Sequence, residues 1–401
     1  MWVTYERVIL VARKALGGLI PAVAVALIAT GCGSTNNVSN GSGSASSADF
    51  GTQICGQAGN TKPGYPAPFA PLPGGAKTLS GAGSTFVAPM MLDWTKEYSQ
   101  STSVQVAYQP IGSGGGVAQI QARTVDFGDS DIGITATEQA KAQGPVLQVP
   151  LLLGAVVPAY HLSGVKSGLK FTGDVLGRIY AGKIKAWNDP GITSLNPGVK
   201  LPNEPIAVVH RSDGSGTTSI WTDFLTKESP TWVSTLGGAN ESHGKTVAWP
   251  TGIGGKGNEG VSGQINQTEG ALGFLELHYA LAQNSTYGQV KNRTGKFVQP
   301  CVATVTKAVN GVTFPPSLNT SLTDGTDPNA YPITGTTYAL FYRNQTDAAK
   351  AAALENFFSW VLSKGQDLNA NLNYAPLGKG LQQLAVKQLK QVTVNGKTVI
   401  K

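Results

Sequence analysis

Apolar runs that end in loops of glycine and hydroxyl residues recur along the chain, and a helical pattern follows each loop. Residues 206–210 are apolar, largely β-branched and bounded by turns, which predicts a buried strand. After a glycine- and serine-rich loop, apolar residues at helical spacing over 220–225 predict a helix that begins at Thr217. A helix start leaves backbone N–H groups unpaired and has a partial positive charge, so this loop is a candidate site for a small anion.

Two further loops have the same construction. Residues 80–86 precede a helix opened by Pro89. Residues 111–116 lie between an alternating strand at 104–108 and a helix that continues through Ile120. Glycine lets the backbone approach closely, and the serine and threonine hydroxyls add donors that have no charge. The pattern therefore predicts three helix starts that could share one anion.

The rest of the pattern indicates an α/β body with largely parallel or mixed sheets. Strand-like apolar runs, among them residues 146–160, alternate with helical patterns. Thr172 is expected to cap one helix, and residues 354–361 predict an amphipathic helix near the end. The glycine-rich stretch 249–260 lacks the Gly-Lys-Ser/Thr ending of a nucleotide-binding loop, so it is interpreted as a turn-rich structural segment.

The first residues predict export. A basic segment precedes an apolar run over 15–29, which is too short for a membrane span and indicates a signal peptide over residues 1–31. The small residues before Cys32 resemble the lipobox of bacterial lipoproteins, which implies that Cys32 becomes the acylated first residue. Ala29 stands where that motif more often has leucine, so a plain secretory signal or an uncleaved anchor is the alternative.

The segment after Cys32 predicts a tether. Residues 32–77 contain a Gly/Ser/Asn tract and then a Pro-rich tract, which is expected to hold a folded body, beginning at residue 78, off a membrane. Export places Cys55 and Cys301 in an oxidising compartment. A disulfide between them is expected, with two free thiols as the alternative.

Charge and residue spacing argue against several classes of function. The formal charge of +7 over 401 residues is mild. The sequence has no basic patch with interleaved aromatic residues, so it does not predict binding of nucleic acid. The four histidines are scattered, without metal-ligand spacing, and no Ser/His/Asp order is present. His210 ends a strand beside the third loop and is interpreted as a packed histidine rather than a catalytic base. The sequence therefore predicts no enzymatic activity, no metal and no cofactor.

The loops 80–89, 111–116, 126–131 and 208–217, in this order, resemble those of the phosphate-binding proteins of bacterial ABC-type phosphate uptake systems. The resemblance covers nearly everything from residue 78 to about residue 377. It implies a two-lobed periplasmic-binding-protein (type II) α/β fold, with the ligand cleft between lobes joined by crossing strands. By this resemblance, residues 78–155 plus 328–401 form lobe 1 and residues 156–327 form lobe 2.

The resemblance also implies a phosphate site built from both lobes. Its expected members are Ser84, Thr85, Phe86, Ser113, Asp131, Arg211, Ser215, Gly216 and Thr217. Thr85 and Phe86 are expected to offer backbone and hydroxyl donors, and Asp213 is expected to pair with Arg211. The alternative for Arg211 is a surface ion pair with Asp213 and no ligand.

Asp131 is expected to set the selectivity. Phosphate keeps a P–O–H proton near neutral pH, and an ionised carboxylate can accept it. Sulfate has no such proton, so its lone pairs would face the carboxylate unpaired, at a penalty of about 1–3 kcal/mol or more. The alternative is a loop or helix-capping aspartate, as expected for Asp126 and Asp129.

The expected function is capture of inorganic phosphate and its delivery to the membrane-embedded permease subunits of an ABC-type transporter. The expected location is the periplasm or the outer face of the cytoplasmic membrane, with acyl chains on Cys32 as the membrane anchor. Closure of the lobes would bury the ligand. The alternatives are a binding protein for another tetrahedral oxyanion, and a phosphate-sensing or phosphatase-like surface protein.

Overall fold

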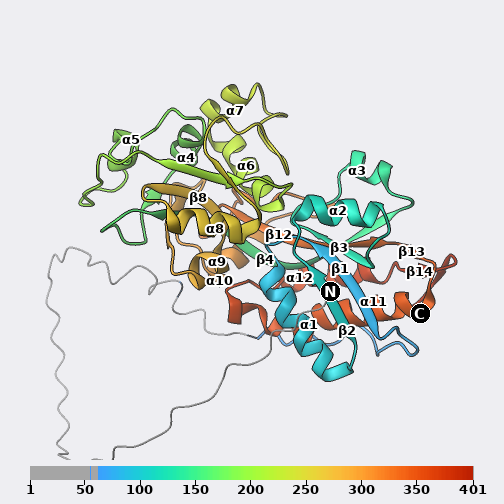
Figure 1. Ribbon diagram of the computed structural model, residues 1–401. Coiled ribbons are helices and arrows are strands. Elements are labelled where there is room, and N and C mark those ends of the chain that lie inside the picture. Colours follow the sequence, from blue (N-terminus) through green and yellow to red (C-terminus); the bar gives the residue numbers. More distant parts are fainter. Residues whose placement is uncertain (1–54, 56–61, 401) are drawn as a thin grey trace, which may run out of the picture. The chain divides into compact units, whose positions relative to one another are not determined.

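The computed structural model describes Cys55 and residues 62–400, which form two groups of helices and strands, here named lobe 1 and lobe 2 (Figure 1). Lobe 1 consists of β1 (Thr78–Gly83), α1 (Ala88–Thr102), β2 (Gln105–Gln109), α2 (Ser113–Gln121), β3 (Phe127–Ser130), α3 (Ala136–Lys141), β12 (Thr334–Tyr342), β13 (Asn344–Gln345), α11 (Ala348–Val361), the 3₁₀ helices η2 (Lys364–Asp367) and η3 (Asn369–Leu372), α12 (Lys379–Leu389), β14 (Thr393–Val394) and β15 (Lys397–Thr398).

Lobe 2 contains the middle of the chain. It consists of β5 (Lys170–Phe171), α4 (Gly173–Tyr180), α5 (Pro190–Thr193), β6 (Ala207–Arg211), α6 (Gly216–Glu228), α7 (Pro230–Leu236), β7 (Ile253–Gly255), α8 (Gly257–Gln267), β8 (Ala271–Glu276), α9 (Leu277–Ala282), β9 (Thr286–Tyr287), β10 (Gln289–Lys291), β11 (Phe297–Val298), α10 (Val302–Thr306) and the 3₁₀ helix η1 (Lys307–Val309). The long strand β4 (Val146–His161) belongs to both lobes.

Within the described residues, nine strands form one mixed sheet that runs through both lobes. Its order is β2-β1-β3-β12-β4-β8-β6-β7, with β9 paired to β4. Strands β2, β1 and β3 are parallel in lobe 1, and β8, β6 and β7 are parallel in lobe 2. The strands between them, β12 and β4, are antiparallel to their neighbours. Two parallel half-sheets are therefore joined by crossing strands.

Strand β4 changes partner along its length. Residues from Val146 to Ala155 pair with β12, and residues from Val156 to His161 pair with β8. All of its residues except His161 are buried, which explains why its sequence is a continuous apolar run rather than an alternating one. The partner of β4 therefore changes between Ala155 and Val156.

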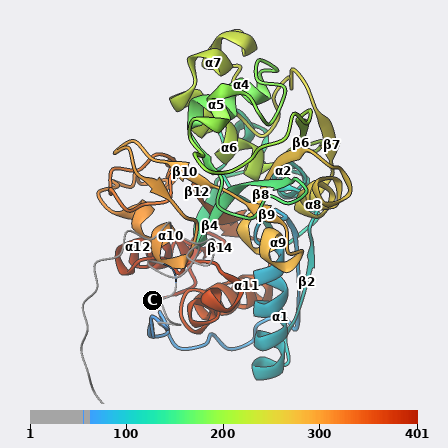
Figure 2. The ribbon, with the colours of Figure 1, turned by 90° about the vertical axis from the view of Figure 1, so that its left-hand side faces the viewer.

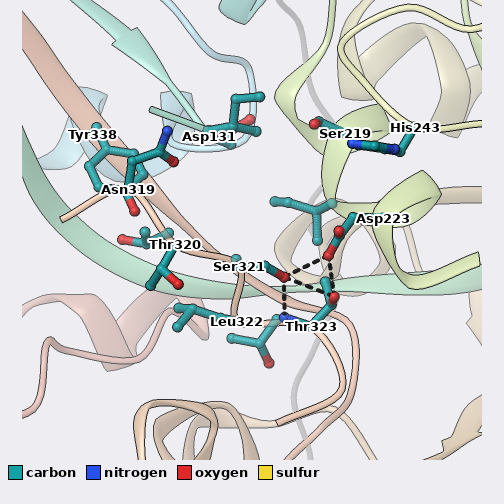
Figure 3. A pocket seen from close by; sticks show the side chains of 15 residues that line it. Asp131, Ser219, Asp223, His243, Asn319, Thr320, Ser321, Leu322, Thr323 and Tyr338 are labelled. Atoms are coloured by element: carbon teal, nitrogen blue, oxygen red, sulfur yellow. Dashed lines mark hydrogen bonds between the residues drawn. The ribbon is translucent and has the colours of Figure 1, made fainter. Parts of the chain in front are cut away.

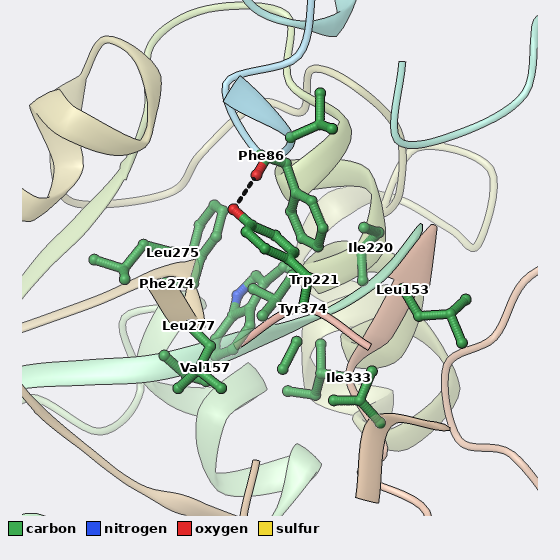
Figure 4. Close-up of a cluster of buried hydrophobic side chains, with 14 of the residues drawn as sticks. Phe86, Leu153, Val157, Ile220, Trp221, Phe274, Leu275, Leu277, Ile333 and Tyr374 are labelled. Carbon is green, nitrogen blue, oxygen red and sulfur yellow. Dashed lines mark hydrogen bonds between the residues drawn. The ribbon is translucent and has the colours of Figure 1, made fainter. Parts of the chain in front are cut away.

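A buried apolar cluster lies where the two lobes meet (Figure 4). Phe86 of lobe 1 packs there beside Leu153 of β4 and beside Trp221 and Phe274 of lobe 2, and all four side chains are fully buried. The hydroxyl of Tyr374 donates to the carbonyl of Phe86 (2.6 Å). Each large buried side chain contributes roughly 1.5–3 kcal/mol of transfer free energy, so this cluster fixes the backbone that leads into the first loop.

The predicted helices and their caps are confirmed in the described residues. Thr172 accepts a hydrogen bond from the N–H of Val175 at the start of α4, and Pro89 lies in the first turn of α1. The predicted helix at 354–361 is the second half of α11. The stretch 249–260, interpreted as a turn-rich structural segment, contains the short strand β7 and the start of α8 as well as turns.

The Pro-rich tract is part of the folded body rather than a free spacer (Figure 2). From residue 62 onward it has no helix or strand before β1, but it lies against α11, where Leu72 N donates to Asn356 Oδ1 (2.8 Å). Tyr65 donates through its hydroxyl to the carbonyl of Leu377 (2.5 Å). Proline needs few hydrogen bonds and has a restricted φ, so such a segment can order on a surface without secondary structure.

Cys55 and Cys301 are joined by a disulfide in the structure, with their Cα atoms 5.8 Å apart. The bond links the segment before the body to the start of α10 in lobe 2. The predicted signal peptide and Cys32 lie outside the described residues. No helix within the described part of the chain is both long and apolar enough to span a bilayer.

Candidate functional site

The three predicted loops meet where lobe 1 faces lobe 2. The N–H of Gly112 donates to the carbonyl of Gly83 (2.8 Å), which joins the first two loops within lobe 1. The N–H of Gly114 donates to the carbonyl of Gly214 (2.9 Å), which joins the second loop to the third across the lobes. Helices α1, α2 and α6 begin at these loops, so three helix N-termini lie close together.

The predicted site residues are all buried. They are Ser84, Thr85, Phe86, Ser113, Asp131, Arg211, Ser215, Gly216 and Thr217. Burial keeps water from these groups, so an anion bound among them would exchange its hydration shell for their hydrogen bonds.

Asp131 follows β3 and accepts hydrogen bonds on both carboxylate oxygens. Thr337 Oγ1 donates to Oδ1 (2.7 Å) and Ser113 Oγ donates to Oδ2 (3.3 Å). Burial raises the pKa of Asp131 to about 6, although hydrogen bonds from hydroxyls, including that of Ser84, and the charge of Arg211 act in the opposite direction. The carboxyl is therefore ionised above about pH 6, where it can accept a proton from a ligand.

Arg211 forms a bidentate ion pair with Asp213. Its Nε lies 2.8 Å from Oδ1 and its Nη2 lies 2.5 Å from Oδ2. Burial alone would raise the pKa of Asp213, but the hydrogen bonds and charge of Arg211 lower it below its ordinary value. Only 1% of the Arg211 side chain is exposed, so the ion pair with Asp213 is not at the surface. Its Nη1 reaches Thr217 Oγ1 (3.3 Å), which places the guanidinium at the start of α6.

Ser215 and Gly216 form the start of α6. Ser215 is the N-cap, since its Oγ accepts from the N–H of Thr218 (3.0 Å), and its hydroxyl hydrogen stays available as a donor. The backbone of Gly216 lies directly against Asp131 and Ser113, so that a side chain there would collide with both. This contact brings a positive helix end from lobe 2 to the carboxylate of lobe 1.

Thr85 is joined to lobe 2 by a residue that sequence reasoning missed. Asn258, in the first turn of α8, donates to Thr85 Oγ1 through its backbone N–H (3.1 Å) and through its Nδ2 (2.9 Å). The same Nδ2 lies 3.4 Å from Thr217 Oγ1. Asn258 belongs to the stretch 249–260, which is interpreted from its sequence as structural. The sequence feature that could have indicated a site there is a polar side chain at a helix start bounded by glycines.

Phe86 differs from its expected contribution. Its N–H donates to Ser84 Oγ (2.9 Å), so in this structure the backbone donor is already used within the loop. The ring is buried in the cluster between the lobes. Phe86 therefore supports the loop through packing, whereas Ser84 is the member that interacts with Asp131.

Two further acids are buried near the site. Asp129 is a fully buried residue of β3, so the expectation that it is a loop or helix-capping aspartate is wrong. Burial raises the pKa of Asp129 well above its ordinary value. Burial likewise raises the pKa of Glu276, the N-cap of α9. Burial thus favours the uncharged form of both acids, which lie close to the anion loops.

Asp131 also borders a cavity of about 170 Å³ between α6, β12 and the loop before β12 (Figure 3). The other acid in its wall, Asp223, accepts from Ser321 Oγ (2.6 Å) and from Lys227 Nζ (2.9 Å). Asp223 is thus paired with a cation. Asp131 is the acid of this wall that lies beside the anion loops, where it accepts from Ser113.

The geometry does not assemble a catalytic group around these loops. His210 stacks on Trp249, with ring centroids 4.9 Å apart, as expected for a packed histidine. Among the residues that the structure describes, no cluster of three or more His, Cys, Asp or Glu side chains could hold a metal ion. The arrangement offers buried hydroxyls, helix starts, one guanidinium and one carboxylate, which suits the binding of a protonated oxyanion.

Known proteins are similar to this chain in sequence and in fold. The model of the PBP superfamily domain matches residues 70–364. A phosphate-binding protein PstS of Xylella fastidiosa (strain Temecula1 / ATCC 700964) is 40% identical over 315 residues, which cover 78% of this chain and 84% of the relative. A phosphate-binding protein PstS of Pasteurella multocida (strain Pm70) is 38% identical over 318 residues, which cover 79% and 90%.

A solved structure extends the likeness to the fold. The phosphate-binding protein from Stenotrophomonas maltophilia is 18% identical, with a TM-score of 0.57, and the match covers 77% of this chain and 93% of that one. Together with the observed sheet, these matches confirm the predicted two-lobed α/β fold.

Proposed function

The chain belongs to the PBP superfamily and, within it, to the PstS phosphate-binding proteins, and from this premise we propose that it binds inorganic phosphate for an ABC-type phosphate transporter. The observation that supports this proposal most directly is that one hydrogen-bond acceptor, a carboxylate, lies among many hydrogen-bond donors. Asp131 lies beside Ser113 and the N-terminus of α6, and Arg211 reaches the same helix start.

This combination fits phosphate better than other anions. The helix starts, the hydroxyls and Arg211 donate to the anionic oxygens, and each such charge-assisted bond contributes roughly 1.5–3 kcal/mol. Asp131 accepts the remaining P–O–H proton, which sulfate lacks. The set Ser84, Thr85, Phe86, Ser113, Asp131, Arg211, Ser215, Gly216 and Thr217 is therefore the proposed phosphate site, with Phe86 acting through packing.

The lobes supply both halves of this site, which gives a mechanism for delivery. Residues 78–155 with 328–401 would move against residues 156–327 about the crossing strands, closing on the anion and opening to release it. A permease that contacts both lobes could distinguish the closed form from the open one. The cross-lobe contacts described above then belong to the closed form.

The proposed location is outside the cytoplasmic membrane, with a lipid anchor on Cys32 after removal of residues 1–31. Cell fractionation of the natural chain and of Cys32→Ser tests the anchor. Wild-type protein should be found with membranes and the variant in the soluble extracytoplasmic fraction. Equal distribution of the two, with residues 1–31 removed from both, would contradict the anchor without affecting the phosphate site.

Isothermal titration calorimetry with phosphate, arsenate and sulfate tests the binding proposal. Phosphate and arsenate should bind, and sulfate should bind at least tenfold more weakly, since a penalty of about 1.4 kcal/mol is a factor of ten. Equal binding of sulfate would favour a general oxyanion-binding protein. Release of product from a phosphomonoester, with or without added metal, would instead favour an enzyme.

A further inference from the structure

Asn258 connects the two threonines of the proposed site to one another and the two lobes to each other. It is fully buried, and it lies on α8 of lobe 2. Its partner Thr85 belongs to lobe 1, whereas Thr217 belongs to α6 of lobe 2. The bonds between Asn258 and Thr85 therefore exist only when the lobes are together.

The orientation of the Asn258 side chain is fixed by a donor. The backbone N–H of Glu276 points at Oδ1 of Asn258 (3.0 Å), and an N–H can only donate. The oxygen of the amide must therefore face Glu276, and Nδ2 must face the threonine hydroxyls. Glu276 lies where β8 pairs with Val156 of the crossing strand, so the amide is held from the junction of the lobes.

This orientation decides what the threonine hydroxyls can do. A hydroxyl has two acceptor positions and one hydrogen. Thr85 Oγ1 accepts twice from Asn258, and Thr217 Oγ1 accepts from Asn258 and from Arg211. Neither hydroxyl hydrogen has an acceptor among the residues that the structure describes, so each is directed away from Asn258.

We infer that Asn258 is a positioning residue that makes Thr85 and Thr217 obligatory donors toward the anion and joins the lobes in the closed form. The inference rests on the proposed phosphate site. It adds to that site a residue that favours anions by fixing the direction in which two hydroxyl groups donate. Asn258 itself has no donor left for the ligand, because its backbone N–H and both hydrogens of its side-chain amide are used.

Three variants test the inference by calorimetry with inorganic phosphate. Asn258→Ala removes the side-chain donor and should weaken phosphate binding roughly 10- to 100-fold. Asn258→Asp keeps the shape but accepts hydrogen bonds from Thr85 and Thr217, which turns their hydrogens away from the anion, so it should weaken binding more than alanine. A residue needed only for packing gives the reverse order, because aspartate is the better isostere. Asn266→Ala is the matched control, since Asn266 lies on the same helix and bonds to Ser285.

A double-mutant cycle with Thr85→Val separates orientation from charge and from stability. If Asn258 acts through the Thr85 hydroxyl, Asn258→Ala should weaken binding less than threefold in the Thr85→Val background. An equal effect in both backgrounds, in variants that keep the wild-type melting temperature, would overturn the inference alone. Wild-type protein that does not bind phosphate would overturn the proposed function, and this inference with it.

Discussion

Gly216 of lobe 2 lies so close to Asp131 of lobe 1 that a β-carbon on the glycine would be 2.5 Å from Asp131 Oδ2. The same β-carbon would be 2.7 Å from Ser113 Oγ. No side chain can occupy this space while the lobes are together. Closure of the two lobes therefore requires glycine at position 216, the first residue of α6.

Gly216→Ala should hold the lobes apart and weaken phosphate binding. Overpacking of a closely packed contact typically costs 1–3 kcal/mol, which corresponds to roughly 5- to 150-fold in affinity. Calorimetry measures the affinity, and small-angle scattering with phosphate should show a smaller contraction than in the wild type. Gly263→Ala is the control, because no atom lies within 4 Å of a β-carbon there. Wild-type affinity in Gly216→Ala would contradict closure around this contact.

Asp131→Asn should reduce the preference for phosphate over sulfate. The amide keeps the size of the carboxylate but can donate, so the penalty against sulfate disappears and the acceptor for the P–O–H proton weakens. The ratio of the two dissociation constants is expected to fall at least tenfold in competitive titrations. The control is Asp223→Asn, whose carboxyl lines the adjacent cavity but is paired with Lys227. Discrimination that is unchanged in Asp131→Asn would remove the role proposed for this residue.

The same preference should depend on pH. Burial raises the pKa of Asp131 to about 6 from its ordinary value of 3.8, so the carboxyl gains a proton as the pH falls through about 6. Protonated Asp131 can donate to sulfate, whereas the ionised form cannot. The phosphate-to-sulfate ratio measured by calorimetry should thus decrease between pH 7.5 and pH 5. In Asp131→Asn the ratio should stay nearly constant over this range, and a parallel decrease would assign the effect to another group.

Much of the proposed site can be named from sequence because its parts are local. The donors of the loop at Ser215 and Gly216 come from residues that are neighbours in the sequence. The same is true of the helix start at Ser113 and of the ion pair between Arg211 and Asp213. Each depends on one helix start or one turn, and the order of the loops supplied the resemblance. The run of apolar residues over 146–160 likewise indicates a strand that is buried on both faces, and β4 is such a strand.

The missed features depend on contacts between distant segments. Asn258 and Thr85 are 173 residues apart, and Thr337 and Asp131 are 206 residues apart, so no local pattern pairs them. The expectation of a loop or helix-capping aspartate at residue 129 is wrong because tertiary packing buries Asp129 in β3, and burial of this kind is rare for aspartate. The composition of the Pro-rich tract predicts a spacer, because composition does not reveal that the side chain of Asn356 on α11 bonds to the backbone of Leu72.

The ion pair between Lys245 and Glu138 should contribute to closure. Lys245 Nζ of lobe 2 lies 2.6 Å from Glu138 Oε1 of α3 in lobe 1, and the carbonyl of Lys245 accepts from the N–H of Ser215. A partly exposed pair contributes about 0.2–1 kcal/mol, so Lys245→Ala should weaken phosphate binding up to roughly fivefold. Stopped-flow fluorescence should assign the loss to faster release.

A matched control for that variant is Lys350→Ala. Lys350 pairs with Asp126 (2.9 Å), and both residues lie in lobe 1, so its loss should lower the melting temperature without changing the release rate. The effect of Lys245→Ala should shrink in high salt, because salt screens exposed pairs. Release at the wild-type rate in Lys245→Ala would show that the pair does not hold the lobes together.

Glu355 should make the fold less stable as the pH rises. It lies fully buried on α11, and neither carboxylate oxygen has a hydrogen-bond partner among the described residues. Burial raises the pKa of Glu355 from 4.5 to about 8, so between these values the unfolded chain loses a proton that the folded chain keeps. The free energy of unfolding should then fall with pH over this window, by up to about 1.4 kcal/mol per unit, and level off above pH 8. Glu355→Gln keeps the shape without the charge, so urea unfolding should show little change at pH 4.5 and a clear gain in stability at pH 8. A difference between variant and wild type that does not vary with pH would mean that the carboxyl has a partner in the folded protein.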